Sequence, residues 1–194
     1  MRQALTSSAV IAEAATLADE QGLQAVTLSA VARRLGVQAP SLYTHVEDLE
    51  ALRDGITAQA LAELSAEISE AIAGRSGRRA LQAFADTHRG YARAFPGRWQ
   101  SLQRRAGRPV VRSDAARNMA EQAGAVLRGY PVPANERVHA IRLLGSTING
   151  FLSLERTGGF DHGEPAPEES WRRTVTALDS LLNAWPTTRD ETRP

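Results

Sequence analysis

Apolar residues recur every three or four positions along most of the chain, and no segment shows the alternation of a half-buried strand. Two such stripes lie near the N-terminus, formed by Val10, Ala14, Leu17 and Ala18 and by Leu28, Val31, Ala32 and Leu35. A helix with one apolar stripe packs that stripe against a core. The pattern therefore predicts an all-α protein of about nine helices.

Residues 27–52 contain signals that start and stop short helices. Thr27 is a good N-cap, Gly36 tolerates the left-handed conformation that often ends a helix, and Pro40 fits the first turn of the next one. Asp48 then caps a third helix. We interpret the segment as a helix-turn-helix whose second helix spans about residues 39–45. A three-helix bundle without a DNA role is the alternative.

The sequence Leu42-Tyr43-Thr44-His45-Val46, followed by Asp48, resembles the DNA-binding domain of TetR-family regulators over about residues 6–56. The resemblance implies a DNA-binding domain at residues 1–50 that places the second helix of the helix-turn-helix, at about residues 39–45, in the major groove. It also implies phosphate contacts from Thr27, Tyr43 and His45. The residues expected nearest base edges are Ser29, Ala39, Pro40, Ser41 and Thr44. Leu49 replaces the lysine that the family usually has there, which removes one phosphate contact.

Three further helices follow this domain. The first runs from Asp48 to about Ile72 with one apolar stripe. After a break at residues 74–77, the second has an apolar face and ends before Pro96; the face consists of Leu81, Phe84, Ala85, His88, Tyr91 and Phe95. A short helical turn around Trp99 and Leu102, a loop at residues 107–109 and a helix capped by Ser113 or Asp114 come next.

The last two helices are predicted at about residues 134–157 and 168–185. The first is apolar on two faces and therefore needs two partners, whereas the second has one stripe, from Trp171 to Trp185. We interpret the pair as a homodimer interface, the alternative being that both stripes belong to the core of one subunit. Residues 51–186 then form a helical ligand-binding and dimerisation domain, and residues 187–194 a loose tail.

The second half of the chain has a weaker resemblance of its own. Residues 146–155, followed by Gly158-Gly159-Phe160, are similar to the WHG-type C-terminal domain of many TetR regulators, over about residues 84–185. The resemblance implies effector binding and dimerisation by this half. Asn149 stands where that domain usually has histidine, which removes proton titration and strong metal ligation.

His88 is the leading candidate for ligand binding, because it falls on an apolar helical face with Phe84. Such a histidine either lies in the core, satisfied by a neighbour, or orients a ligand in a mostly apolar cavity. The other candidate ligand-binding residues are Phe84, Tyr91, Trp99, Arg142, Ser146, Asn149 and Trp171.

The net charge of +1 is unevenly distributed along the 194 residues. Residues 1–55 hold four arginines against seven acidic residues, whereas residues 75–117 hold eleven arginines against two. Because non-specific DNA affinity rises with the number of phosphates neutralised, an acidic DNA-binding domain must depend on dimerisation and fitted contacts. The arginine-rich segment is a solvated surface, an anionic effector site or a secondary DNA contact.

Several functional classes are disfavoured by the sequence. The chain has no cysteine, none of its four histidines has a two-histidine metal spacing, and Glu136 and His139 make only one Glu-x-x-His. The sequence shows no membrane span, phosphate-binding loop or catalytic set, so we expect a cytoplasmic protein without metal or cofactor.

The predicted function is a homodimeric transcriptional regulator, most simply a repressor released from a palindromic operator of double-stranded DNA by a small-molecule effector. The alternatives are a ligand-independent regulator or activator, and an enzyme with a helical binding module.

Overall fold

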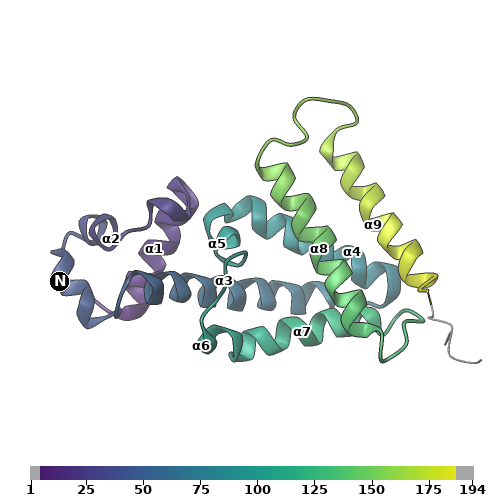
Figure 1. The fold of residues 1–194 in the computed structure, drawn as a ribbon, viewed down its shortest axis with the longest axis horizontal. Helices are drawn as coiled ribbons and strands as arrows, with labels where there is room; N and C mark the ends of the chain where they lie inside the picture. Colours follow the sequence, from purple (N-terminus) through teal and green to yellow (C-terminus); the bar gives the residue numbers. More distant parts are fainter. Residues whose placement is uncertain (1–4, 187–194) are drawn as a thin grey trace, which may run out of the picture. The chain divides into compact units, whose positions relative to one another are not determined.

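The computed structural model describes residues 5–186, which form nine α-helices and two 3-10 helices and contain no strand (Figure 1). The prediction of an all-α fold is confirmed, and the tail predicted at residues 187–194 lies outside the described residues. In chain order the helices are α1 (Ser7–Gln21), η1 (Leu23–Ala25), α2 (Leu28–Leu35), η2 (Ala39–Thr44), α3 (Leu49–Ile72), α4 (Gly77–Ala94), α5 (Pro96–Ser101), α6 (Arg108–Val111), α7 (Asp114–Leu127), α8 (Arg137–Arg156) and α9 (Pro167–Asn183).

The described residues divide into two compact units. Unit 1 comprises the residues up to Ala66 together with Gly90–Met119, and unit 2 comprises Glu67–Arg89 together with the residues from Ala120 onward. Helices α3, α4 and α7 therefore each contribute residues to both units. None of the helices in residues 5–186 is long and apolar enough to cross a membrane.

The head, which we define as α1, η1, α2 and η2, has an apolar core continuous with the start of α3. Its helices begin where the sequence predicts. The side chain of Thr27 accepts a hydrogen bond from the Ala30 amide at 3.1 Å, and Asp48 accepts one from the Ala51 amide at 2.7 Å. Gly36 ends α2 with φ of 66°, a left-handed conformation that favours glycine. Leu42 and Val46, four positions apart on and just after η2, are buried.

The second helix of the helix-turn-helix is a 3-10 helix. Within it the amides of Ser41 and His45 donate to the carbonyl oxygens three residues earlier, Gln38 and Leu42, at 2.9 and 2.8 Å. A six-residue segment that starts with a proline in its first turn suits this tighter helix, which occurs in short pieces. The tighter turn changes which side chains share a face.

The middle of the chain differs from the predictions in two places. Phe95 lies outside α4 and is the N-cap residue of α5, which starts at Pro96. The loop predicted at residues 107–109 is wrong in part, because α6 begins at Arg108, with Pro109 in its first turn. A proline there loses no helical hydrogen bond, so its presence did not exclude a helix. Ser113, and not Asp114, caps α7, by accepting from the Ala116 amide.

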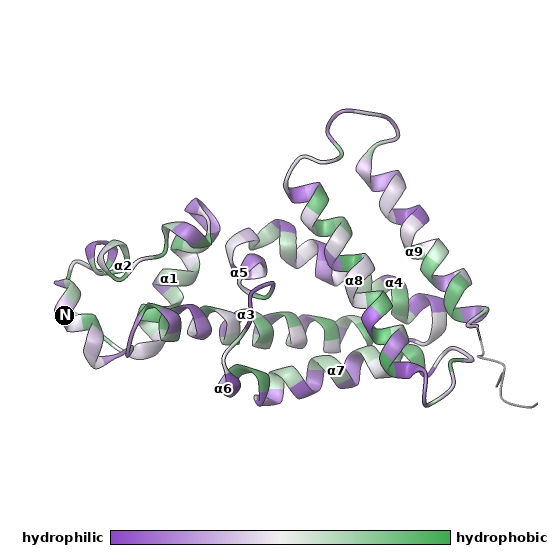
Figure 2. Cartoon of the chain, viewed as in Figure 1, coloured by the Kyte–Doolittle hydropathy of each residue, from purple (hydrophilic) through white to green (hydrophobic). Residues whose placement is uncertain are grey.

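In unit 2, α8 starts three residues later than predicted, at Arg137, and α9 ends two residues earlier, at Asn183. Both helices bury apolar residues, namely Ala140, Leu144, Ile148, Phe151 and Leu152 on α8 and Trp171, Val175, Leu178 and Leu182 on α9. Figure 2 shows hydrophobic positions along both helices. Val138, Leu154 and Leu181 are exposed in the single chain, so part of the apolar surface of this pair is uncovered.

Candidate functional site

The side chains predicted to contact DNA lie on or beside α2 and η2, which pack against each other in the head. Tyr43 is 59 % exposed, the highest value among the large hydrophobic residues of the head. The other exposed members are Thr27, Ser29, Pro40, Ser41 and Thr44, and the half-buried ones are Ala39 and His45. All eight predicted residues are therefore at least partly accessible to a partner.

Local hydrogen bonds fix several of these groups. The Thr44 hydroxyl donates to the Ser41 carbonyl oxygen at 2.9 Å, and the Ser7 hydroxyl donates to the His45 carbonyl oxygen at 2.8 Å. Because the Thr27 oxygen accepts from an amide, its proton remains available to donate to a phosphate. These contacts orient the head's exposed face without using up its hydrogen-bonding capacity.

The acidic residues of the head are mostly paired with arginines. Arg34 forms ion pairs with Glu13 and Glu20 within the head. Arg98 pairs with Asp19, and Arg104 pairs with Asp54 and Glu50 at the start of α3. The hydrogen bonds to Glu20 and Glu13 hold the pKa of Arg34 above its ordinary value. The count that made this domain acidic is therefore incomplete, because Arg98 and Arg104 come from later in the chain and belong to the same unit.

The arginine-rich segment is only partly the solvated surface that was one of its predicted roles. Eight of its eleven arginines are at exposed positions, namely Arg75, Arg78, Arg79, Arg93, Arg105, Arg108, Arg112 and Arg117. By contrast, Arg89, Arg98 and Arg104 have side chains that are 9 %, 16 % and 20 % exposed and pair with carboxylates. A run of arginines does not reveal which members have partners, because the partners lie far away in the sequence.

The predicted ligand-binding residues are distributed over both units. Tyr91 and Trp99 belong to unit 1 and are buried. The other six belong to unit 2, where Phe84, His88 and Trp171 are buried, Asn149 is half-buried, and Arg142 and Ser146 are exposed on α8. The structure thus does not group the eight residues within one unit.

His88 is a neutral, buried histidine. Its Nδ1 lies 2.8 Å from the Phe84 carbonyl oxygen, and the Phe84 and His88 rings are 4.4 Å apart. A carbonyl oxygen only accepts, so Nδ1 carries the proton and Nε2 is left as a hydrogen-bond acceptor. Burial lowers the pKa of His88, against a smaller opposite effect of the Phe84 hydrogen bond. The charged form is disfavoured, which suits an apolar surrounding.

Trp171 lies in an aromatic cluster around Arg89. The Arg89 guanidinium lies 5.3 Å from the Trp171 ring centroid and 5.8 Å from that of Phe151, and it pairs with Glu155. The Trp171 indole N–H donates to Asp86 at 2.7 Å. Sequence reasoning missed Arg89, Asp86 and Glu155 because nothing in their spacing distinguishes them from exposed charges.

Tyr91 takes part in a charged network within unit 1. Its hydroxyl donates to Glu63 Oε2 at 2.7 Å, and Arg98 donates to the same oxygen at 3.0 Å. Burial and the bond to Glu63 raise the pKa of Tyr91. Burial opposes ionisation of Glu63, but hydrogen bonds from Gln59, Tyr91 and Arg98 outweigh it, so its pKa is lowered.

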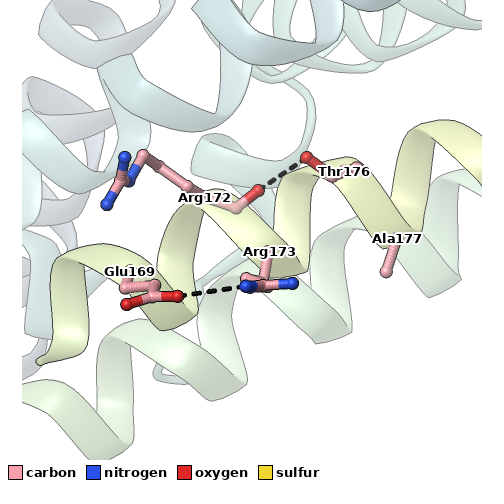
Figure 3. Close-up of a pocket in the computed structure, with 5 residues that line it drawn as sticks. All are labelled: Glu169, Arg172, Arg173, Thr176 and Ala177. Carbon is pink, nitrogen blue, oxygen red and sulfur yellow. Dashed lines mark hydrogen bonds and ion pairs between the residues drawn. The ribbon is translucent and has the colours of Figure 1, made fainter. Parts of the chain in front are cut away.

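Two surface pockets are defined within single units. One, of about 430 Å³, lies along α9 and is lined by Glu169, Arg172, Arg173, Thr176 and Ala177 (Figure 3). The other, of about 260 Å³, lies in unit 1 and is lined by Leu23, Gln24, Arg53, Gln100, Gln103 and Arg104. Neither contains a predicted ligand-binding residue. Within residues 5–186 no group of three His, Asp or Glu side chains is arranged to hold a metal ion.

Comparison with known families decides the identity of both halves. Residues 10–53 match the family described as bacterial regulatory proteins, tetR family, and residues 81–178 match the tetracyclin repressor-like C-terminal domain. The chain belongs to the TetR family of transcriptional regulators. The HTH-type transcriptional regulator Rv0681 of Mycobacterium tuberculosis is 31 % identical over 159 residues, which is 81 % of this chain and 73 % of that protein.

Solved structures of TetR-family proteins share the fold. TetR-Q116A from Acinetobacter baumannii AYE in complex with minocycline superposes with a TM-score of 0.74 at 22 % identity, covering 95 % of this chain and 100 % of the other. ActR of Streptomyces coelicolor in complex with (S)-DNPA gives a TM-score of 0.71 at 16 % identity, covering 94 % and 98 %. These structures show a shared fold, and the family matches at residues 10–53 and 81–178 confirm the sequence resemblance to TetR regulators for both halves.

Proposed function

We propose that the protein is a homodimeric repressor that binds a palindromic operator and is released when a small molecule occupies its helical domain. The observation that carries the proposal is the exposed face of α2 and η2, which form the helix-turn-helix of a DNA-binding family. This face consists of hydroxyl groups, small side chains and the ring of Tyr43. Proteins that bind DNA through the major groove present such a face to the bases.

In this proposal Thr27, Tyr43 and His45 contact phosphates, and the remaining residues of the face lie near base edges. Ser29, Ala39, Pro40, Ser41 and Thr44 have short side chains without a bidentate donor pair. They suit contacts with thymine methyl groups and recognition of DNA shape. Sequence preference would therefore depend on fit more than on arginine–guanine pairing.

The proposed dimer forms through α8 and α9. Val138 and Leu154 on α8 and Leu181 on α9 are 48 %, 52 % and 41 % exposed in the single chain. In this proposal a second copy of the chain covers these side chains and removes them from water. The two-fold axis would then fix the spacing of the operator half-sites.

The proposed effector binds in unit 2 near Phe84, His88 and Trp171, with Arg142, Ser146 and Asn149 of the same unit as further candidates. The TetR-family structures with minocycline and with (S)-DNPA support a small organic effector for this chain. The neutral His88 offers an acceptor at Nε2, which favours an effector with a hydroxyl or N–H group over an anion. In this proposal the protein does no chemistry on its ligand.

The test is footprinting of the purified protein on the DNA upstream of its own gene, followed by affinity measurements on the protected fragment. We expect a protected palindrome, and at least tenfold weaker binding by Tyr43→Ala. Asn118→Ala, at an exposed position of α7, is the control and should bind as the wild type does. Wild-type affinity in Tyr43→Ala would contradict the proposed DNA face.

A further inference from the structure

The first turn of α5 lies directly against the backbone of α1. A Cβ added at Gly97 would lie 2.1 Å from both the carbonyl carbon and the carbonyl oxygen of Ala18. No side chain fits at that distance, so only glycine permits this approach. The contact joins the head to a helix that starts more than seventy residues later.

Asp19 supplies the N-terminal cap that α5 lacks. The residue before α5, Phe95, makes no side-chain cap. Instead, Oδ1 of Asp19 accepts hydrogen bonds from the amides of Gly97 and Arg98, both at 2.9 Å, and Oδ2 lies 2.9 Å from Arg98 Nε. One carboxylate on α1 thus satisfies two donors that the first turn of a helix leaves unpaired. We name the contacts of Asp19 with Gly97 and Arg98 the seat.

Further polar contacts extend the seat to α3 and α4. Arg98 bonds Glu63 on α3, and Tyr91 on α4 bonds the same carboxylate oxygen. The Arg98 guanidinium also lies 4.2 Å from the Phe95 ring centroid, which limits its freedom. Four helices of unit 1 are therefore linked through one series of side chains, from Tyr91 through Glu63 and Arg98 to Asp19.

We infer that Asp19 is a positioning residue for operator binding: by capping α5 it fixes the orientation of α1, and with it the exposed face of the head. The Tyr91 hydroxyl supports this function from α4 by holding Glu63 against Arg98. The inference rests on the proposed operator binding. A dimer reads two half-sites at once, so a rigidly seated head accepts one spacing and rejects others.

The test compares two DNA fragments: the protected operator and a version with one base pair inserted between its half-sites. We expect the wild type to bind the original at least tenfold more tightly, and Asp19→Ala, which removes both carboxylate oxygens, to reduce this ratio at least threefold. Glu13→Ala is the matched control, because Glu13 is also a paired carboxylate on α1 but bonds Arg34 within the head. It should keep the wild-type ratio.

A merely structural role for Asp19 would weaken binding to both fragments equally and leave the ratio unchanged. An unchanged ratio, with or without weaker binding, would overturn the inference. Tyr91→Phe, which removes one hydroxyl, should lower the ratio in the same direction by less, and it replaces Asp19→Ala in the test if that variant does not fold. If the wild type binds no operator, the proposed function fails separately. Hydrogen exchange then tests the seat: faster exchange of the Gly97 and Arg98 amides in Asp19→Ala supports it, and unchanged exchange overturns it.

Discussion

Arg98 in unit 1 and Arg89 in unit 2 make the same kinds of contact in different surroundings. Each guanidinium lies over an aromatic ring and pairs with carboxylates, Arg98 with Asp19 and Glu63 and Arg89 with Glu155. The environments differ in solvent exposure and in aromatic neighbours. The Arg89 side chain is 9 % exposed and lies near two aromatic rings, whereas the Arg98 side chain is 16 % exposed, lies near one ring, and has a Glu63 partner that is 32 % exposed.

The difference indicates what each arginine contributes. A buried ion pair is costly to break, because removing one member leaves the other charge buried without a partner. A partly exposed pair contributes less to stability but specifies geometry through its directed hydrogen bonds. We therefore expect Arg89 to stabilise unit 2, and the ion pairs of Arg98 to fix the orientation of the head within unit 1.

The largest predicted effect is that of Arg89→Ala. Loss of the guanidinium removes the ion pair with the half-buried Glu155 and opens space beside Trp171, so the free energy of unfolding should fall by about 3 kcal/mol. Arg79→Ala, at an exposed position of the same helix, should change it by less than about 0.5 kcal/mol. Denaturant unfolding of both variants measures the difference. If Arg89→Ala cost less than Arg79→Ala, the two arginine environments would not differ as described.

The next effect is a dependence on pH that belongs to His88. Since burial depresses its pKa in the folded state, the unfolded chain binds the proton first as pH falls below about 6.5. Stability should then decrease by up to about 1.4 kcal/mol for each pH unit over which only the unfolded state is protonated. His88→Gln should flatten this decrease in unfolding curves at pH 5 to 8. His139→Gln, at an exposed position of α8, is the control and should keep the wild-type slope.

The local signals in the sequence predicted the fold well. Caps at Thr27 and Asp48, the stop at Gly36 and the buried stripes are set by residues within one or two turns, so a single sequence contains them. The 3-10 form of η2 was not predicted, because the apolar positions of so short a segment fit an α-helix as well as a 3-10 helix. Helix ends in unit 2 moved by two or three residues, as is usual for boundaries.

Contacts between distant residues were not predictable from the sequence. Asp19 and Arg98 are 79 positions apart, and Arg104 and Asp54 are 50 apart, so each looked like an ordinary surface charge. Counting charge by sequence block therefore overstated the acidity of the head. The one local hint to the seat is the Pro96-Gly97 pair, which was interpreted only as a helix end. Which predicted residues bind DNA or ligand stays a prediction.

The smallest predicted effect separates two neighbouring arginines of the basic segment. Arg104 pairs with Asp54 and Glu50, and Arg105 is exposed. Arg104→Gln should lower the free energy of unfolding by about 1 kcal/mol, since one partner is largely exposed, and Arg105→Gln should leave it unchanged. Both variants should keep the wild-type dependence of operator affinity on salt, because Arg104 is neutralised inside unit 1 and Arg105 is expected to face water. An arginine that binds a phosphate would instead reduce the slope of log K against log salt by about 0.9 when removed. That result for Arg105→Gln would show that Arg105 binds a DNA phosphate, and the proposed DNA-binding surface would then extend beyond α2 and η2.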